Sequence, residues 1–471
     1  MAKPTIVLLP SWGSGHFMSA LEAGKRLVVS GSSAISLTVL VMLAPTETKS
    51  SEVDDHVRRE SAANPGLDIQ FRRLPVVEHP TGCSETAEDF TSRYVQLHAP
   101  HVKGAIAALT SPVAAVVIDL FFTPLLDAVA HELSLPSYFY FASTAAFLSL
   151  MLRHELTTSS GFADLEGSAV DAVPGLPPLP PSNIPVCLAP RKNYDWFEYH
   201  GRRFAEAKGV IVNSSVDLEC AVLAAIPPNP PIHPIGPVIW FNNENLPSPP
   251  PQQHECVRWL DAQPGGSVVY LCFGSIGYHE ASQAREIAAG LERSNHRFLW
   301  ILRGAPTSGV RYPTDANLGD LLPPGFTEST SGRGMVWPRW APQKEILAHA
   351  SIGGFMTHCG WNSALESMWF GVPMAAWPLY GEQHLNAFEL VESMGVAIEV
   401  KRGRRNNTGS FVEGAEVERV VRRLMMTPGG GEVGRKAREM RDACRKAVEE
   451  EGGSSRAAMQ RLVREIVGRI E

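Results

Sequence analysis

Residues 340–383, WAPQKEILAHASIGGFMTHCGWNSALESMWFGVPMAAWPLYGEQ, decide the fold prediction for this chain. Within them, GGFMTH (353–358) is a short apolar run typical of a buried parallel strand, and CGWNSALES (359–367) turns into a helix through Gly360. PMAAWP (373–378) is a second apolar run of the same kind. A strand, a helix and another strand in this order predict a doubly wound α/β domain.

The same segment places polar side chains where a strand ends and a helix begins. Asn362 and Ser363 fall at the helix start, where unpaired backbone N–H groups and the helix dipole favour an anion such as phosphate. His358 ends the preceding strand and could donate to the same phosphates, although a lone histidine is commonly a core residue. Glu366 could either close a capping box with Ser363 or accept hydrogen bonds from two ribose hydroxyls.

Further candidates flank this turn. The face of Trp340 can stack on a nucleobase, and the side chain of Gln343 could read the edge of that base. Glu382 and Gln383 would put two hydrogen-bonding side chains on sugar hydroxyls. Each has an ordinary alternative, which is apolar packing for the tryptophan and a solvated loop for the last two residues. So many polar groups at strand ends within one segment favour a nucleotide-sugar site over core packing.

Apolar runs of this kind form two series along the chain, and a proline-rich passage (226–253) separates them. The first series contains residues 5–10, 36–43, 114–119, 136–141 and 209–214, and the second contains residues 267–275, 297–302, 334–337, 353–358 and 373–378. A length of 471 residues also exceeds one ordinary core. We therefore predict an N-terminal domain (1–240), a linker (241–252), a second domain (253–452) and a C-terminal helix (453–471) that packs back on the first domain, with Ser454 or Ser455 as its N-cap.

Composition excludes several classes of protein. The chain is 44% hydrophobic and 19% charged, and its net charge of −7 argues against binding nucleic acid as the main task. No apolar run reaches the roughly 18 residues that a membrane helix requires, and the N-terminus reads as a first strand, not as a signal peptide. Seven scattered cysteines without a CxxC pair favour reduced thiols in a cytosolic protein over disulfides or a zinc site. We expect a cytoplasmic protein without a membrane span or a metal ion.

PSWGSGHF (10–17) follows the first strand and precedes a helix, at the sheet edge where α/β proteins bind ligands. Gly13 and Gly15 allow a tight turn that brings the helix start close to a ligand. Met18 occupies the third glycine position of a dinucleotide fingerprint, which weakens an oxidoreductase interpretation. At a helix N-terminus, His16 is biased toward neutral imidazole and could accept a proton, unless it only hydrogen-bonds within its loop.

Asp119 ends the strand at 114–119 and therefore lies at the same kind of edge. If its carboxylate reaches His16, it would fix the imidazole tautomer and stabilise the imidazolium that forms during proton transfer. The alternative is a helix cap, because a helix is expected to start near Thr123.

Residues 340–383 resemble the signature box of plant secondary-product glycosyltransferases, from its opening Trp to its closing Gln. GSGH (13–16), Asp119, the FGS turn (273–275) and LPPGF (322–326) also match, so the resemblance covers essentially the whole chain. It implies a GT-B fold, with two Rossmann-like doubly wound domains facing across a cleft. The acceptor would lie mainly on the first domain and UDP-sugar mainly on the second. Transfer would be inverting, would give a β-glycoside and would need neither a metal ion nor a bound cofactor.

The resemblance also implies roles for individual residues. His16 would be the base that deprotonates the acceptor, and Asp119 would be its partner. Glu366 would hold the ribose, and a closing Gln383 is usually associated with glucose. The other donor-site residues that it implies are Gly15, Ser275, Trp340, Ala341, Gln343, His358, Trp361, Asn362, Ser363 and Glu382.

Aromatic side chains near His16 predict walls for a flat phenolic acceptor, although such rings are more often core. Phe122 is the first candidate, with Phe141 and Trp196 after it, and the wider set also contains Phe121, Tyr138, Phe147, Tyr194 and Phe197. GHFMS (15–19) is similar to a subset of the family that acts on flavonoids and related phenolics. We therefore expect a monomeric enzyme that transfers glucose from UDP-glucose to a phenolic hydroxyl.

Three alternatives remain open from the sequence. Gly381 stands where Ala or Ser is commoner in the family, which leaves room beside the sugar and keeps donor choice and O- versus C-attachment open. A protein that holds a UDP-sugar without catalysis is disfavoured by the presence of His16 and Asp119. A nicotinamide-dependent dehydrogenase is disfavoured by Met18.

Overall fold

The computed structural model describes residues 3–31, 34–63, 66–82, 86–153, 171–188, 191–241, 253–307, 312–401, 403–404, 410–426 and 431–468. The chain divides into a first unit, residues 1–247 with 444–471, and a second unit, residues 248–443. The predicted linker (241–252) lies outside the described residues, apart from Phe241. Among the described residues, no helix combines the length and the apolar character that crossing a membrane requires.

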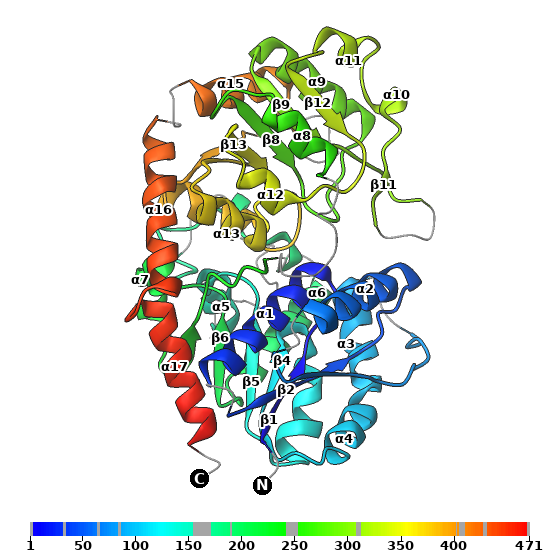
Figure 1. Ribbon diagram of the computed structural model, residues 1–471, viewed down its shortest axis with the longest axis vertical. Coiled ribbons are helices and arrows are strands. Elements are labelled where there is room, and N and C mark those ends of the chain that lie inside the picture. Colours follow the sequence, from blue (N-terminus) through cyan, green and yellow to red (C-terminus); the bar gives the residue numbers. More distant parts are fainter. Residues whose placement is uncertain are drawn as a thin grey trace. The chain divides into compact units, whose positions relative to one another are not determined.

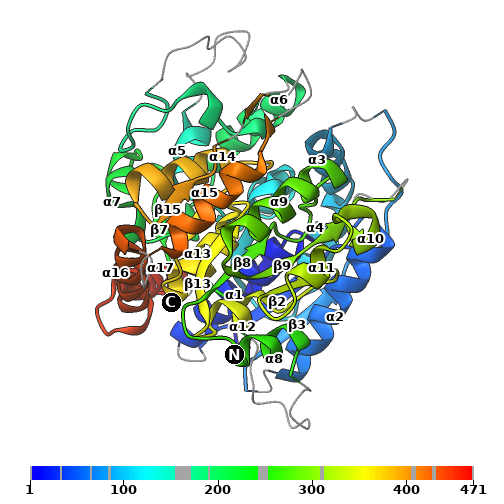
Figure 2. The same cartoon turned by 90° about the horizontal axis from the view of Figure 1, so that it is seen from above.

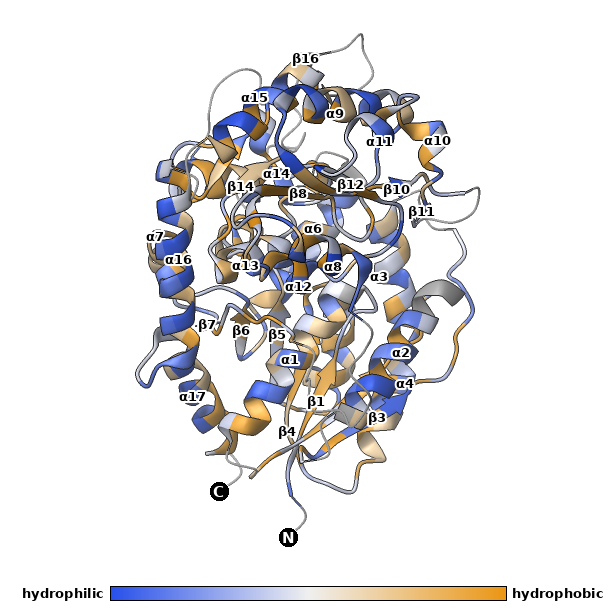
Figure 3. Cartoon of the chain, turned by 45° about the horizontal axis from the view of Figure 1, so that its top comes forward, coloured by the Kyte–Doolittle hydropathy of each residue, from blue (hydrophilic) through white to orange (hydrophobic). Residues whose placement is uncertain are grey.

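The first unit is built on a sheet whose described strands all pair in parallel, in the order β3-β2-β1-β4-β5-β6-β7 (Figure 1). The strands are β1 (Thr5–Leu9), β2 (Ser36–Val41), β3 (Ile69–Arg73), β4 (Val113–Asp119), β5 (Ser137–Phe141), β6 (Gly209–Val212) and β7 (Ile232–Pro234). The inner strands β1 and β4 are almost fully buried and mostly orange in Figure 3, as their apolar runs predict. The edge strands β3 and β7 are only partly buried, and the sequence analysis did not find them because they lack such runs.

Helices connect the strands of this unit. They are α1 (Ser14–Ser30), α2 (Glu47–Ala63), α3 (Ala87–Leu97), α4 (Ala99–Ala107), α5 (Ala145–Leu152), α6 (Arg191–Phe204), α7 (Val216–Ala225) and α17 (Ser454–Val467), with the short helices η1 (Leu120–Leu125), η2 (Asp127–His131), η5 (Pro181–Asn183) and η6 (Val186–Leu188). α1 packs against β1, β2, α2 and α17, and α3 and α6 both pack against η1. These two helices therefore cover η1, which directly follows the end of β4.

The C-terminal helix α17 packs against α1, α7 and β7 within the first unit. It buries the apolar face that the sequence predicts, formed by Met459, Leu462, Val463 and Ile466. The predicted serine N-cap is wrong, because Gly453 is the N-cap and Ser454 already begins the helix. The two serines instead anchor the helix, since Ser454 donates to Asp217 and Ser455 donates to the carbonyl of Gly236.

The second unit also contains a parallel sheet, with the order β12-β9-β8-β13-β14-β15. Its strands are β8 (Val268–Cys272), β9 (Arg297–Ile301), β12 (Gly334–Trp337), β13 (Ile352–Thr357), β14 (Met374–Ala376) and β15 (Ala397–Glu399). Two short antiparallel pairs accompany it, β10 (Arg303–Gly304) with β11 (Thr314–Asp315), and β16 (Gly403–Arg404) with β17 (Ser410–Phe411). β15 lies at the edge of this sheet, and the sequence does not predict it.

Helices cover both faces of this second sheet (Figures 1 and 2). The helices are α8 (Glu255–Asp261), α9 (Ala281–Ser294), α10 (Leu318–Leu321), α11 (Phe326–Ser329), α12 (Gln343–Leu347), α13 (Trp361–Phe370), α14 (Gln383–Phe388), η7 (Glu389–Ser393), α15 (Gly414–Met425) and α16 (Gly431–Glu449), the last of which contains the division between the units. α9 and α15 lie side by side over one face, whereas α8, α12 and α13 lie on the other. A core cluster that includes Leu271, Ile287, Trp300 and Val417 fills the layer between α9, α15 and the sheet.

Both sheets share one topology. Numbered along each unit, the first six strands follow the order 3-2-1-4-5-6, so the chain returns to the middle of the sheet between β1 and β4, and again between β8 and β13. Ligands of such sheets bind outside the carboxyl ends of the strands at this switch point. The topology therefore brings the loop after β1 close to Asp119, and the loop after β8 close to His358.

Candidate active site

His16 and Asp119 meet at the switch point of the first sheet. The Nδ1 atom of His16, in the first turn of α1, lies 3.1 Å from the Oδ2 atom of Asp119, the last residue of β4. The Asp119 side chain is fully buried, whereas 32% of the His16 side chain is exposed. The other carboxylate oxygen, Oδ1, accepts the backbone N–H of Phe121 at 3.1 Å and caps η1. Asp119 therefore contacts His16 through one oxygen and caps η1 through the other.

This contact determines which nitrogen of the His16 imidazole can accept a proton. A buried carboxylate that accepts the Nδ1–H proton selects the tautomer whose Nε2 atom carries the lone pair. An Nε2 lone pair on a partly exposed ring can take a proton from a hydroxyl, and the carboxylate then stabilises the imidazolium. The pair of His16 and Asp119 thus has the geometry of a general base with its orienting partner.

The ring of Phe121 lies beside that of His16, with a centroid distance of 5.4 Å. Phe122, which the sequence analysis ranked first, is fully buried and packs against Trp12 at 5.2 Å. The hydrogen bond from the Phe121 N–H to Asp119 fixes the start of η1, and consecutive side chains then point in different directions. Asp119 as a helix cap at the strand end is the sequence signal that could have favoured Phe121 over Phe122 as the neighbour of His16.

The two other aromatic candidates differ from each other in exposure. Phe141 is fully buried and packs against Phe147 at 5.8 Å. Trp196, on α6, is partly buried, and its indole N–H donates to Asp89 at 2.9 Å. Its ring stacks on His200 at 6.0 Å, and burial lowers the pKa of His200 to about 3, so this imidazole is neutral. Among these candidates, Trp196 has side-chain surface left for a ligand.

In the second unit, His358 follows β13 and is 6% exposed. A Cβ atom added at Gly274, in the loop after β8, or at Gly360 would overlap the His358 ring, so both glycines let the backbone approach the imidazole closely. Burial lowers the pKa of His358 to about 4. At neutral pH the ring is therefore uncharged, and it can serve a phosphate as a hydrogen-bond donor but not as a cation.

Residues 358–360 connect β13 to α13 through an unusual backbone conformation. Cys359 is buried and has a φ of 64°, in the left-handed region that non-glycine residues rarely adopt. α13 begins at Trp361, and its N-cap Gly360 provides no side-chain hydrogen bond to the first turn. Asn362 and Ser363 lie in that first turn, as the sequence predicts. The N–H groups of this turn are the kind that bind anions.

Gln343 links two of the predicted donor-site residues. Its Nε2 atom, at the start of α12, donates to Ser363 Oγ at 3.0 Å and to Glu366 Oε2 at 2.8 Å. The capping box that Ser363 and Glu366 could have formed is absent, because the helix already begins at Trp361 and both side chains bond to Gln343. Burial raises the pKa of Glu366, and the hydrogen bond from Gln343 only partly offsets that shift.

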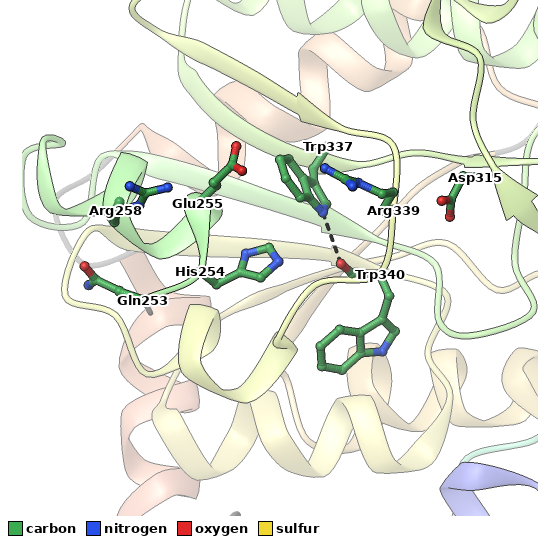
Figure 4. Close-up of a pocket in the computed structure, with 8 residues that line it drawn as sticks. All are labelled: Gln253, His254, Glu255, Arg258, Asp315, Trp337, Arg339 and Trp340. Carbon is green, nitrogen blue, oxygen red and sulfur yellow. Dashed lines mark hydrogen bonds between the residues drawn. The ribbon is translucent and has the colours of Figure 1, made fainter. Parts of the chain in front are cut away.

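Trp340 lies at the edge of a polar pocket of about 520 Å³ and is 67% exposed (Figure 4). The indole N–H of Trp337 donates to the carbonyl oxygen of Trp340 at 3.0 Å, and the Arg339 guanidinium lies 4.8 Å from the centre of the Trp337 ring. Figure 4 shows the Trp340 ring turned away from that of Trp337. The pocket is lined by Gln253, His254, Glu255, Arg258, Asp315, Trp337, Arg339 and Trp340. Trp340 is the single lining residue that belongs to the predicted donor site.

The remaining donor-site candidates fall into exposed and buried groups. Gln383 is 3% exposed, and its Oε1 atom accepts the backbone N–H groups of Leu379 and Tyr380, each at 3.0 Å. Gly381 has a φ of 62° and open space where a Cβ would lie, so backbone conformation and not crowding explains its glycine. Ala341 and Trp361 are buried, Glu382 is partly buried, and Gly15 and Ser275 are exposed. Among the described residues, no group of three or more His, Cys, Asp or Glu side chains could hold a metal ion.

Sequence reasoning missed two residues that support this site. Asn386, on α14, donates from Nδ2 to the carbonyl oxygen of Cys359 at 3.0 Å. Trp337 holds the backbone of Trp340, as described above. Neither contact has a local signature, because Asn386 is 27 positions from Cys359, and an apolar strand end such as Trp337 normally indicates packing.

Comparisons with known proteins identify the class. Residues 233–412 match the family model described as "UDP-glucoronosyl and UDP-glucosyl transferase". A crystal structure of a Medicago truncatula glycosyltransferase complexed with UDP-glucose is 33% identical, with a TM-score of 0.84, and covers 99% of each chain. A Phytolacca americana enzyme complexed with UDP-2-fluoro-glucose and pterostilbene is 32% identical, with a TM-score of 0.84, and covers 98% of this chain and all of that one. Fold and relatives together define a GT-B transferase that uses a UDP-sugar.

A curated relative narrows the class further. The malvidin galactosylase of Oryza sativa subsp. japonica is 52% identical over 491 aligned positions, which cover 100% of this chain and 99% of that protein. The chain belongs to the plant UDP-glycosyltransferases (family 1) and is an enzyme of the hexosyltransferase type.

Proposed function

We propose that this enzyme transfers glucose from UDP-glucose to a hydroxyl of a small phenolic acceptor such as a flavonoid, and that the product is a β-glucoside. The catalytic part of this proposal rests on the 3.1 Å contact between His16 Nδ1 and Asp119 Oδ2. In the proposed step, His16 Nε2 takes the proton of the acceptor hydroxyl. The acceptor oxygen then bonds to the anomeric carbon as the bond from that carbon to the diphosphate oxygen breaks. UDP leaves with the electron pair of the broken bond, and attack from the opposite face inverts the configuration.

The donor half of the proposal rests on groups in the second unit. The first turn of α13 and the neutral, donating His358 would stabilise the charge that develops on the leaving diphosphate. Trp340, with its exposed ring, would stack on uracil. Glu366 would accept the ribose hydroxyls through the lone pairs that its hydrogen bond from Gln343 leaves open. We propose that these roles need no metal ion, because the positive end of the α13 dipole would face the leaving group.

The acceptor half rests on the surroundings of His16. Phe121 packs beside the imidazole, and Trp196 offers a partly exposed ring on α6. Flat aromatic walls suit a flat phenolic acceptor. A phenolic hydroxyl also loses its proton more easily than an alcohol, which suits a histidine base. The relatives support this class of acceptor, since malvidin and pterostilbene appear in their names.

Galactose is the second candidate for the transferred sugar. The observation that favours it is the name of the malvidin galactosylase, which shares 52% identity with this chain. Gln383, which favours glucose, is 3% exposed, and its Oε1 atom is bonded to two backbone N–H groups. Its contact with a sugar would therefore come from the amide nitrogen, unless the turn at 379–380 rearranges. Glucose and galactose differ at the 4-hydroxyl, so this contact decides between them only if it reaches that group.

The test is a donor competition with a mixed panel of flavonoids and other phenolics. The enzyme is incubated with UDP-glucose and UDP-galactose at equal concentrations, and the products are separated by chromatography and identified by mass and by sugar analysis. We expect glucosides that acid hydrolyses, which indicates O-attachment. If galactosides predominate, UDP-galactose and not UDP-glucose is the preferred donor. Acid-stable products would indicate C-attachment. Failure to consume either donor with any acceptor would contradict the proposed substrates.

A further inference from the structure

The turn between β13 and α13 holds a buried cysteine in a strained conformation. Cys359 has a φ of 64° and is 0% exposed. An L-residue disfavours this left-handed region because its Cβ comes too close to the following carbonyl oxygen. The conformation therefore persists only where neighbouring groups hold the peptide in place. It also sets the direction in which the first turn of α13 points.

Hydrogen bonds to both backbone groups of Cys359 hold this turn. The N–H of Cys359 donates to Thr357 Oγ1 at 3.3 Å, and the carbonyl oxygen of Cys359 accepts Asn386 Nδ2 at 3.0 Å. The threonine is a neighbour in sequence, whereas the asparagine comes from α14. Asn386 thus ties the turn to a separate helix.

Burial of Asn386 has an energetic cost. It is 0% exposed, and its Oδ1 atom has no hydrogen-bond partner among the described residues. An unsatisfied buried acceptor destabilises the folded state, so an apolar side chain of the same size would be favoured if this position only filled space. The donation from Nδ2 to the carbonyl oxygen of Cys359 is the contact that an apolar residue would lose.

We infer that Asn386 is a positioning residue for transfer: it locks the turn at 358–360 so that His358 and the first-turn N–H groups of α13 face the diphosphate. This inference rests on the proposed function, in which that helix start binds UDP. Asn386 lies three residues after Gln383 on α14, about one helical turn away. The same helix therefore supports the sugar-facing residue and the phosphate-facing turn.

The test compares two ligands in the purified full-length enzyme, UDP and uridine, the second of which lacks phosphate. Asn386→Leu removes the donor and also the unsatisfied acceptor. We expect it to weaken UDP binding by about 3- to 10-fold. Without the hydrogen bond, a smaller fraction of the molecules holds residues 358–360 in the conformation that binds the diphosphate. Binding of uridine should not change. Both affinities are measured by calorimetry or by ligand-observed NMR titration.

Ser367→Ala is the matched control. Ser367 is also fully buried and donates from Oγ to a backbone carbonyl, that of Val372 at 2.8 Å, but it lies near the C-terminal end of α13. We expect this variant to lower the melting temperature without changing the affinity for UDP. A general loss of packing would affect UDP binding in both variants alike.

A rescue experiment separates positioning from packing. Glycine adopts a positive φ without strain, so Cys359→Gly in the Asn386→Leu background should restore most of the lost UDP affinity. A role limited to packing predicts no rescue, because the glycine removes a further buried side chain. If the leucine variant does not fold, Asn386→Ala removes the same donor and carries the same comparison.

The outcomes are distinguishable from those of the proposed function. A wild-type enzyme that does not bind UDP overturns both. Wild-type binding of UDP combined with unchanged binding in a folded Asn386 variant overturns the inference alone. Equal losses for UDP and uridine, or no rescue by glycine, overturn it as well.

Discussion

The Nδ1 atom of His16 lies 3.1 Å from the Oδ2 atom of Asp119, although 103 positions separate the two residues in the chain. The contact exists because β1 and β4 are neighbours in the sheet, with Leu9 paired to Ile118. A loop that leaves the end of β1 therefore begins beside the end of β4.

Asp119→Asn should lower kcat by about 10²- to 10⁴-fold, because an amide can stabilise the wrong imidazole tautomer and cannot stabilise an imidazolium. His16→Ala should abolish transfer. In both variants, the affinity for UDP should equal that of the wild type, since these residues belong to the first unit and the proposed UDP site to the second. Kinetics with saturating UDP-sugar and calorimetry with UDP check the two parts. Full activity of the alanine variant would remove His16 from the mechanism.

Glu366→Gln should raise the KM for the UDP-sugar by about tenfold, because a neutral amide accepts more weakly from ribose hydroxyls. The same variant should be the more heat-stable protein at pH 7.5. Burial raises the pKa of Glu366 above its ordinary value of 4.5, so the folded state favours the protonated carboxyl, and ionisation costs stability as the pH rises above 4.5. Melting temperatures at pH 4.0 and 7.5 check the sign. The difference between variant and wild type should shrink at pH 4.0, and a difference that grows there would contradict this account.

His279→Phe should protect the enzyme against mild acid. His279 is 7% exposed, packs against the rings of Phe273 and Trp377, and has an Nε2 atom without a hydrogen-bond partner among the described residues. Burial lowers its pKa from 6.5 to about 4. Between these two values the unfolded chain binds a proton that the folded chain does not, so stability falls as the pH drops. A shift of this size corresponds to about 3 kcal/mol once the pH reaches 4.

Thermal unfolding of the wild type and of the His279→Phe variant at pH 7.5 and pH 5.0 measures this effect. The advantage of phenylalanine should increase at the lower pH. Parallel melting curves at both pH values would show that His279 contributes nothing to acid sensitivity.

Trp337→Phe should weaken UDP-sugar binding by about 3- to 5-fold, because the indole N–H that holds the Trp340 carbonyl is lost while an aromatic side chain remains at this position. The turnover number should stay close to that of the wild type. Trp259→Phe, on α8 but outside the pocket lining, is the control and should change neither constant. An unchanged KM in the Trp337 variant would mean that Trp340 keeps its position without this bond.

The strand pattern of both units was predictable from local apolar runs. The run at 353–358 became β13 (Ile352–Thr357), and the run at 114–119 became β4 (Val113–Asp119). Prediction failed at β3, β7 and β15, because edge or very short strands lack a continuous apolar run. It also misassigned the cap of α17, since the serines there hydrogen-bond to distant partners and not to their own helix.

The sequence predicts the kinds of residue in the candidate site, and the family resemblance implies the pairing of His16 with Asp119, but the other contacts are not predictable. The glycines, the helix start at Trp361 and the strand ends at His358 and Asp119 follow from patterns within a few positions, because local sterics and periodicity act over that range. Which groups touch depends on strand order, and hydrophobic periodicity does not encode strand order. Only the tertiary structure shows that Phe121, and not Phe122, lies beside His16. It also shows that Gln343 donates to both Ser363 and Glu366. It likewise brought Asn386 to Cys359, since packing of distant segments is settled by the whole core.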